Sequence, residues 1–299
     1  ALSLTPVLAH RAVLDRATYD GTSNLPTMAG RLSGRQLGID TKMIASSIEG
    51  RITSDGEAVE LSQAVVGWAG GKARIERANV RPFEQGLPLD AEGVHVENVT
   101  LQGLMDNLAG DAHSHVGWLI ADTHVPTFTG TLDPLMLEGP LTTQTRDFVV
   151  YDRPTTDPLR RRMMGIDAGT VGGQFRGTPD AIVLSDFTIV TPRARVRTTV
   201  RLGYAEQLAI HVYEGSTVDL ADVSPLVGIP MSGVAKVKID GAGAFTDPRL
   251  EGTIAMNDFV FSGSPIGDLT EAKVKFRPLV LELSDAHVQH HKSGVDIAE

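Results

Sequence analysis

A group of histidines near the end of the sequence offers the first residue types whose spacing could do chemistry. His287, His290 and His291 lie close to Asp285, and imidazole and carboxylate groups are common zinc ligands. Successive side chains of an extended strand point to opposite faces, so His287 and His291 share one face and His290 lies on the other. Ligation of a metal by all three histidines of one strand is therefore awkward, and we predict no metal site here.

A second group combines Asp111, His113 and His115, which would share one face of an extended segment. This geometry suits a metal better than the first group does. The segment is polar, however, and it lies between Gly110 and Gly117, which is typical of a loop. We expect a solvated turn.

Nucleophilic and phosphate-binding motifs are missing from the sequence. There is no cysteine, which excludes thiolate catalysis, disulfides and cysteine-based zinc sites. No G-x-S-x-G elbow occurs. The glycine spacings at residues 165–169 and 241–243 lack the following helix that phosphate binding needs. We therefore predict no catalytic residue, no cofactor and no enzymatic activity.

The elements that must position any site are strands, because period-two alternation of apolar and polar residues dominates the chain. Clear examples are residues 196–202, 235–240, 274–277 and 279–283. Such alternation indicates antiparallel sheet with one face buried. Turn dipeptides such as Asp240-Gly241 separate strands of roughly five to nine residues. The expected fold class is all-β.

Helical signal is confined to three short stretches. Residues 6–17 have apolar residues at helical spacing and predict a short helix. Residues 101–108 and 219–227 predict a turn or two each. Nothing helical alternates regularly with the strands, so a βαβ architecture is not expected.

Composition excludes several partners and anchors. The formal net charge is −10, and binding to nucleic-acid phosphates needs a Lys/Arg footprint, so we predict no nucleic-acid partner. No apolar run approaches the roughly 18 residues of a membrane span. The start of the chain lacks the features of a signal peptide and its end stops in a strand-like alternation. We expect a segment of a longer protein whose membrane anchor lies outside this segment.

Two passages of the chain resemble each other and indicate an internal repeat. Residues 128–139 contain Asp133-Pro134, and residues 245–252 contain Asp247-Pro248 in a similar setting. Each passage is followed by an Asp-Phe-Val triplet, at residues 147–149 and 258–260. We predict three segments: a β-rich segment over residues 1–103, a repeat unit over 104–217 and a repeat unit over 218–299. Units of this kind bury their apolar faces by stacking on their neighbours.

The order of motifs over residues 218–297 resembles the repeated pattern of TamB/AsmA-like envelope proteins. A "D-hydrophobic-S-P-L-hydrophobic-G" segment is followed by a Gly-initiated strand, by G-x-F-x-D-P-x-L-x-G and a strand, and by "I-G-D-L-x-x-A-x-V-x-F". Residues 104–150 match this order of motifs less closely, and the first 90 residues resemble the family only in general character. No single motif is diagnostic; the order carries the resemblance.

The resemblance implies a long curled antiparallel sheet, open along one edge like a folded taco, with an apolar inner face. It implies a periplasmic location in the cell envelope, anchorage in the inner membrane and a role in moving phospholipid between membranes. It also implies a possible outer-membrane barrel protein as a partner. Such a groove would shelter acyl chains at ~0.8 kcal/mol per buried methylene. The candidate lining residues are Val196, Val200, Leu202, Val237, Ile239, Leu250, Ile254, Phe259, Phe261, Val274, Phe276, Leu281 and Leu283.

Other readings of the same pattern stay open. Alternation assigns residues to a common face but does not say what covers that face, so the same side chains could form the filled core of a structural or adhesive β-repeat protein. A polysaccharide-active β-helix would need regular short rungs with stacked Asn or aromatic ladders. The sequence contains neither feature.

Overall fold

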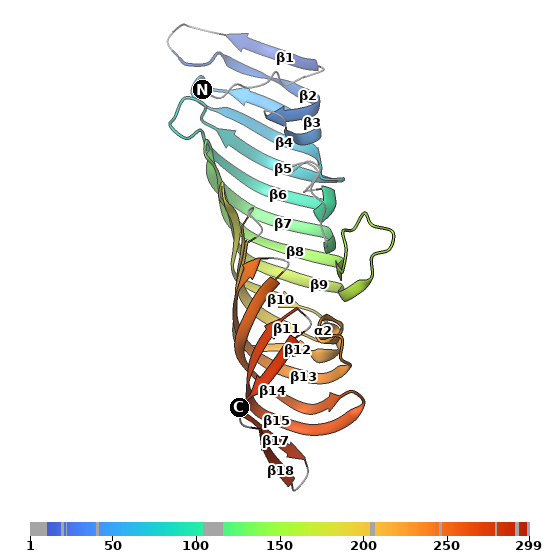
Figure 1. Cartoon of the computed structure of the whole chain (residues 1–299). Helices are drawn as coiled ribbons and strands as arrows, with labels where there is room; N and C mark the ends of the chain where they lie inside the picture. Colours follow the sequence, from blue (N-terminus) through green and yellow to red (C-terminus); the bar gives the residue numbers. More distant parts are fainter. Residues whose placement is uncertain are drawn as a thin grey trace. The chain divides into compact units, whose positions relative to one another are not determined.

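A computed structural model of the chain describes residues 11–18, 21, 23–39, 42–103, 116–203, 207–244, 247–278, 280–290 and 293–297. The chain forms two compact units. The first holds β1 to β7 and most of β8, and the second holds most of β9, all later strands and helix α2 (Figure 1). The strands are β1 (Arg11–Thr18), β2 (Thr27–Ile39), β3 (Lys42–Ser54), β4 (Val59–Trp68), β5 (Gly71–Val80), β6 (Pro88–Thr100), β7 (Val116–Leu132), β8 (Leu135–Tyr151), β9 (Arg162–Gly177), β10 (Ala181–Val190), β11 (Arg195–Gly203), β12 (Gln207–Asp219), β13 (Met231–Ala244), β14 (Asp247–Phe261), β15 (Ser264–Arg277), β16 (Val280–Ser284), β17 (Ala286–His290) and β18 (Ser293–Ile297), with α2 at Leu220–Val227.

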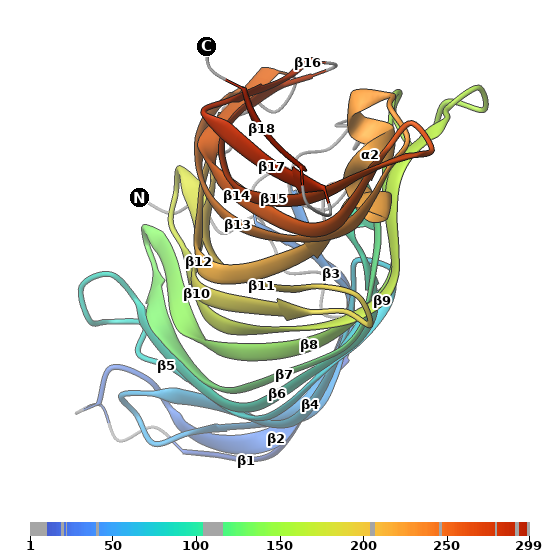
Figure 2. The same ribbon diagram turned by 90° about the horizontal axis from the view of Figure 1, so that it is seen from below.

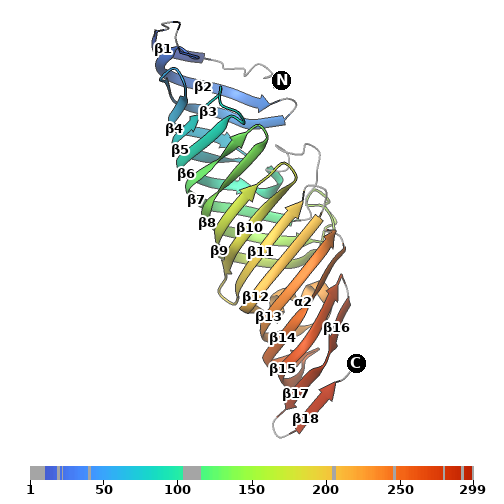
Figure 3. The same cartoon turned by 90° about the vertical axis from the view of Figure 1, so that its left-hand side faces the viewer.

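Antiparallel pairing follows the order of the chain within each unit. In the first unit β1 to β7 pair successively. In the second unit β10 to β15 pair successively, as Figure 3 shows, and β15 then pairs with both β16 and β17. The strands belong to one 18-stranded sheet, and no described pairing closes it on itself. The predicted all-β, curled antiparallel sheet with minor helices is confirmed.

The strands are longer than the sequence predicted, reaching 17 residues in β7 and β8. In β8, β10 and β14, bulges shift the alternation without ending the strand. Asp147, Asp186 and Asp258 each adopt a left-handed backbone conformation with φ near 51–52°, which aspartate tolerates better than most residues. A bulge also bends its strand, and Figure 2 shows the strands of each unit strongly curved.

These bulges explain part of the internal repeat. Each bulge aspartate is followed by a phenylalanine, and Phe187 and Phe259 are buried, so the bulge returns an aromatic ring to the inner face. The Asp-Phe pair at residues 186–187 lacks the valine that drew attention to the other two. The repeat boundaries at 103/104 and 217/218 stay predictions.

The predicted helices have three outcomes. Helix α2 confirms the prediction for residues 219–227. The helix predicted over residues 6–17 is wrong for its described part, since β1 pairs with Thr27–Ser33 of β2 and takes its hydrogen bonds from that strand. The first five residues of that range lie outside the described residues. Only residues 101–103 of the third range are described, and they are helical.

The residues of α2 account for its ends. The side chain of Asp219 accepts a hydrogen bond from the backbone N–H of Ala221 and caps the first turn. Gly228 ends the helix in a left-handed conformation with φ 70°. Ser224 Oγ donates to the carbonyl of Ile229 at 2.6 Å and accepts from the N–H of Met231 at 3.0 Å. The hydroxyl therefore ties the helix to the start of β13.

Candidate functional site

The pairing registers of the second unit place apolar residues in continuous rows across the sheet. One row crosses six strands near the hairpins that join β11 to β12, β13 to β14 and β15 to β16. Every member is apolar or glycine, so the inner face carries a continuous apolar strip across these six strands. The row is Val200, Ile210, Gly241, Leu250, Phe276 and Leu281.

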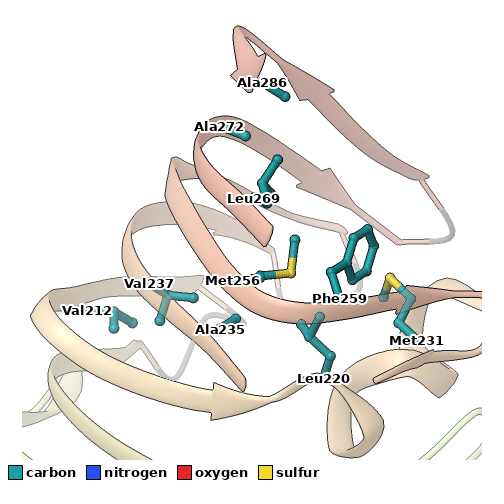
Figure 4. Packing of buried hydrophobic residues seen from close by; sticks show 10 residues of the cluster. All are labelled: Val212, Leu220, Met231, Ala235, Val237, Met256, Phe259, Leu269, Ala272 and Ala286. Carbon is teal, nitrogen blue, oxygen red and sulfur yellow. The ribbon is translucent and has the colours of Figure 1, made fainter. Parts of the chain in front are cut away.

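One half of this inner face is packed as an ordinary core. Helix α2 lies against β13 and β12, and its Leu220 is buried beside Met231 and Phe259. Figure 4 shows these side chains together with Met256 and Leu269 on the inner side of the curled strands. This half has no room for a guest without displacing α2.

The other half of the inner face is only partly covered. The thirteen predicted lining residues share one face, although in β14 this depends on the bulge at Asp258, which brings Phe259 and Phe261 to the face of Leu250 and Ile254. Their burial differs. Val237 and Phe259 are each 7% exposed and belong to the packed cluster, Val274 is 7% exposed but lies outside that cluster, and Phe261 is 40% exposed. The remaining nine are half-buried. Five of them pack against the cluster (Val196, Ile239, Ile254, Leu281 and Leu283) and four do not (Val200, Leu202, Leu250 and Phe276).

Hydroxyl groups that reach the inner face are satisfied by the backbone. Thr198 Oγ donates to the carbonyl of His211 at 2.8 Å, and Ser216 Oγ donates to that of Tyr213 at 2.7 Å. Both residues are almost fully buried. Because an unpaired polar atom would cost a few kcal/mol against hydrocarbon, these bonds keep the face compatible with an apolar ligand.

The first unit repeats this design. Ala64, Ile75, Val94 and Val125 face one another across β4 to β7 and form an apolar row. Thr143 Oγ of β8 bonds both Thr123 Oγ at 2.6 Å and the carbonyl of Asp122 at 3.1 Å. The hydroxyls of this inner face are thus paired as well.

The opposite face of the sheet is polar and carries ion pairs between neighbouring strands. Arg77 faces Glu92 at 3.1 Å, and Arg197 lies 3.3 Å from Asp186. Both pairs are exposed, and each such pair contributes about 0–1 kcal/mol. These ion pairs contribute to the solubility of this face more than to the stability of the fold.

The histidines singled out in the sequence do not form a ligand set among the described residues. His287 pairs with Asp296 of β18, and Asp285 pairs with Lys273 at 2.6 Å. Over the described ranges no group of three His, Cys, Asp or Glu residues is arranged to hold a metal ion. His291, and the group Asp111, His113 and His115, lie outside the described residues.

A depression of about 960 Å³ lies on the second unit near the same hairpins. Two rows of polar-face residues line it together with four residues of the apolar row that lies between them, and sequence reasoning did not predict it. These four are Ile210, Gly241, Leu250 and Phe276. Alternation marks the other lining residues as polar-face positions, but only the register shows that they form two rows. The row nearer the hairpins is Arg201, Ala209, Ala242, Arg249, Arg277 and Val280, and the second is Thr199, His211, Asp240, Glu251, Lys275 and Glu282.

Comparison of this chain with protein-family models, with curated proteins and with solved structures finds no match. Within the described residues, no helix combines the length and the hydrophobicity that a membrane crossing requires.

Proposed function

We propose that this chain is a segment of a cell-envelope protein that holds lipid acyl chains against the inner apolar face of its curled sheet. The observation that carries the proposal is the half-buried apolar row from Val200 to Leu281, in which only Ile210 and Leu281 pack against the buried cluster. Each methylene that such a face removes from water contributes ~0.8 kcal/mol. No catalytic group is needed, since a lipid can slide along a continuous apolar strip.

The cellular setting belongs to the same proposal and follows from the resemblance to TamB/AsmA-like proteins. The segment would lie in the periplasm and carry phospholipid between the inner and outer membranes. A part of the protein outside this segment would anchor it in the inner membrane. An outer-membrane barrel protein is the proposed partner where the protein supports outer-membrane assembly.

A structural β-repeat protein with a filled core is the second candidate. The packed half around α2, with Leu220, Met231 and Phe259, favours it. The two candidates differ in what happens at the half-buried row, which a guest would cover in the first and which stays empty in the second.

The test is lipid binding by the purified chain. Native mass spectrometry and lipid extraction should find co-purified phospholipid, and a fluorescent acyl-chain probe should bind. The variant Leu250→Asp/Phe276→Asp places two carboxylates on the half-buried row and should abolish both signals, because a buried charge is costly. The control Thr270→Asp puts the same charge on the exposed polar side of β15 and should change neither. A folded wild-type chain without lipid that ignores the probe would leave the structural repeat as the better account.

A further inference from the structure

The arginines of the depression depart from the arginine–carboxylate pairing of Arg77 with Glu92 and of Arg197 with Asp186, as Arg31 and Arg51 of the first unit also do. Leu250 pairs with Phe276, so Arg249 and Arg277 stand directly opposite each other on neighbouring strands. Side chains in this position have Cβ atoms about 4.5–5.5 Å apart, and like charges there repel. The register therefore places two arginines side by side on neighbouring strands, where like charges are unfavourable.

Nearby carboxylates do little to relieve this repulsion. Arg277 lies 4.0 Å from Glu282, with both side chains more than half exposed, which makes a weak pair. Arg249 is exposed and makes no ion pair or side-chain hydrogen bond with a described residue. Arg201, at the far end of the row, pairs with Asp180. Arg249 is thus unpaired, and Arg277 makes only a weak ion pair.

The acidic residues of the depression have cationic neighbours of their own. Lys275 faces Glu251 on one side and Glu282 on the other, and His211 pairs with Asp240. These four charges and His211 belong to the second row, one pleat further from the hairpins. Excess positive charge is therefore concentrated in the row that carries the arginines.

Two small residues of that row leave space for a ligand between the arginines, and we call them the alanine floor. Ala209 and Ala242 face each other between Arg201 and Arg249. Three strand spacings separate the two arginines, or about 14 Å between their backbones. A phosphate placed over Arg249 and Arg277 would leave the rest of an extended ligand lying over the alanines toward Arg201.

The row also lies close to the apolar strip. Arg249 precedes Leu250 and is the third residue of β14, and Arg277 follows Phe276 and is the last residue of β15, so both lie near the rim of the sheet. Two residues of strand span about 7 Å. A lipid whose chains lie on the inner face could carry its head group around this rim to the arginines.

We infer that Arg249 and Arg277 bind a phosphate group, and that the rest of the ligand lies over the alanine floor toward Arg201. Guanidinium groups suit this ligand because their planar fork of N–H donors makes paired hydrogen bonds to phosphate oxygens. The phosphate could come from a lipid head group or from a soluble phosphate. The lipid source rests on the function proposed above, whereas the phosphate site does not.

The test uses the full chain and two arms. In the first arm, inorganic phosphate is titrated into protein with ¹³C-labelled alanine methyl groups, and the resonances of Ala209 and Ala242 report on the floor. In the second arm, binding to vesicles of pure phosphatidylcholine is compared with binding to vesicles in which about one lipid in four is phosphatidylglycerol. The wild-type chain should prefer the anionic vesicles about tenfold or more, although its net charge of −10 opposes this.

The variant Arg249→Gln/Arg277→Gln should lose the phosphate-induced shifts and most of the vesicle preference. The matched control is Arg31→Gln/Arg51→Gln, which removes another pair of directly opposed, exposed arginines that lies in the first unit. The control should keep both responses. Unchanged circular dichroism and melting of both variants would exclude unfolding as the cause of any loss.

The outcomes separate the two proposals. If phosphate shifts the alanines but no acyl probe binds, the phosphate site stands as a site for a soluble ligand and the lipid function fails. If acyl chains bind but phosphate has no effect and both kinds of vesicle bind equally, the phosphate site is refuted alone. Wild-type responses in the Arg249→Gln/Arg277→Gln variant would also refute it.

Discussion

Truncation of two phenylalanines on the same face should have very different effects on stability. Phe259 is 7% exposed, belongs to the cluster around α2 and packs its ring edge-on against Phe261 at 6.1 Å. Phe→Ala at a site of this kind costs about 3–5 kcal/mol through lost burial and the cavity left behind. Phe276 is half-buried in the row between Leu250 and Leu281, so Phe276→Ala should cost only about 1–2 kcal/mol.

The assay must report on the second unit. Trp68 and Trp118 both belong to the first unit, so tryptophan fluorescence would follow the wrong part of the chain. Hydrogen exchange of peptides from β14 and β15 measures local opening where the two substitutions lie. In these peptides Phe259→Ala should raise exchange far more than Phe276→Ala does.

Equal destabilisation by the two substitutions would refute this reasoning. It would mean that Phe276 is as tightly packed as Phe259 and that the whole inner face is a filled core. A much smaller effect of Phe276→Ala, together with loss of acyl-probe binding, would support an open half that receives a guest.

Three further predictions concern local structure. Asp258→Val should destabilise β14 by about 1–2 kcal/mol because a β-branched residue strains a left-handed conformation. Asp258→Gly should be tolerated, and equal melting temperatures of the two variants would contradict this prediction. Ser224→Ala should cost about 1–3 kcal/mol because it leaves the N–H of Met231 buried without a partner, and faster exchange of the Met231 amide would confirm it. Hydrogen bonds from two backbone N–H groups in the β3–β4 turn lower the pKa of Asp55 from its ordinary value. Its stabilisation of the turn should be complete above that ordinary value and lost as the pH falls through the lowered pKa; Asp55→Ala should remove this pH dependence, as amide exchange in the turn would show.

The sequence predicted much of the local structure because alternation is a local signal. Residues 196–202 and 235–240 lie within β11 and β13, and residues 219–227 form α2 as predicted. The turn predicted at Asp240-Gly241 is wrong, since both residues lie inside β13. A side-chain period of two fixes the face within each regular stretch of strand, and in β14 the bulge at Asp258 brings Phe259 and Phe261 to the face of Leu250 and Ile254.

Local signals failed where a bulge or a distant partner decides the outcome. A bulge at Asp258 shifts the alternation between Met256 and Phe259. The sequence of this one long strand therefore shows the pattern of two short strands. The segment Arg11–Thr18 has apolar residues at helical spacing, but pairing with β2 makes it a strand. Helix propensity over so few residues is too weak to resist an available strand partner.

The sequence by itself determined that this chain is an antiparallel, all-β protein with one apolar face, whereas the curl of the sheet was implied only by the resemblance to a family. Only the tertiary structure decided which part of that face α2 covers and which part stays half-buried, because coverage depends on contacts between distant segments. The opposition of Arg249 and Arg277 likewise depends on the register between β14 and β15. Register is set by the pairing of whole strands, and no short stretch of sequence contains it.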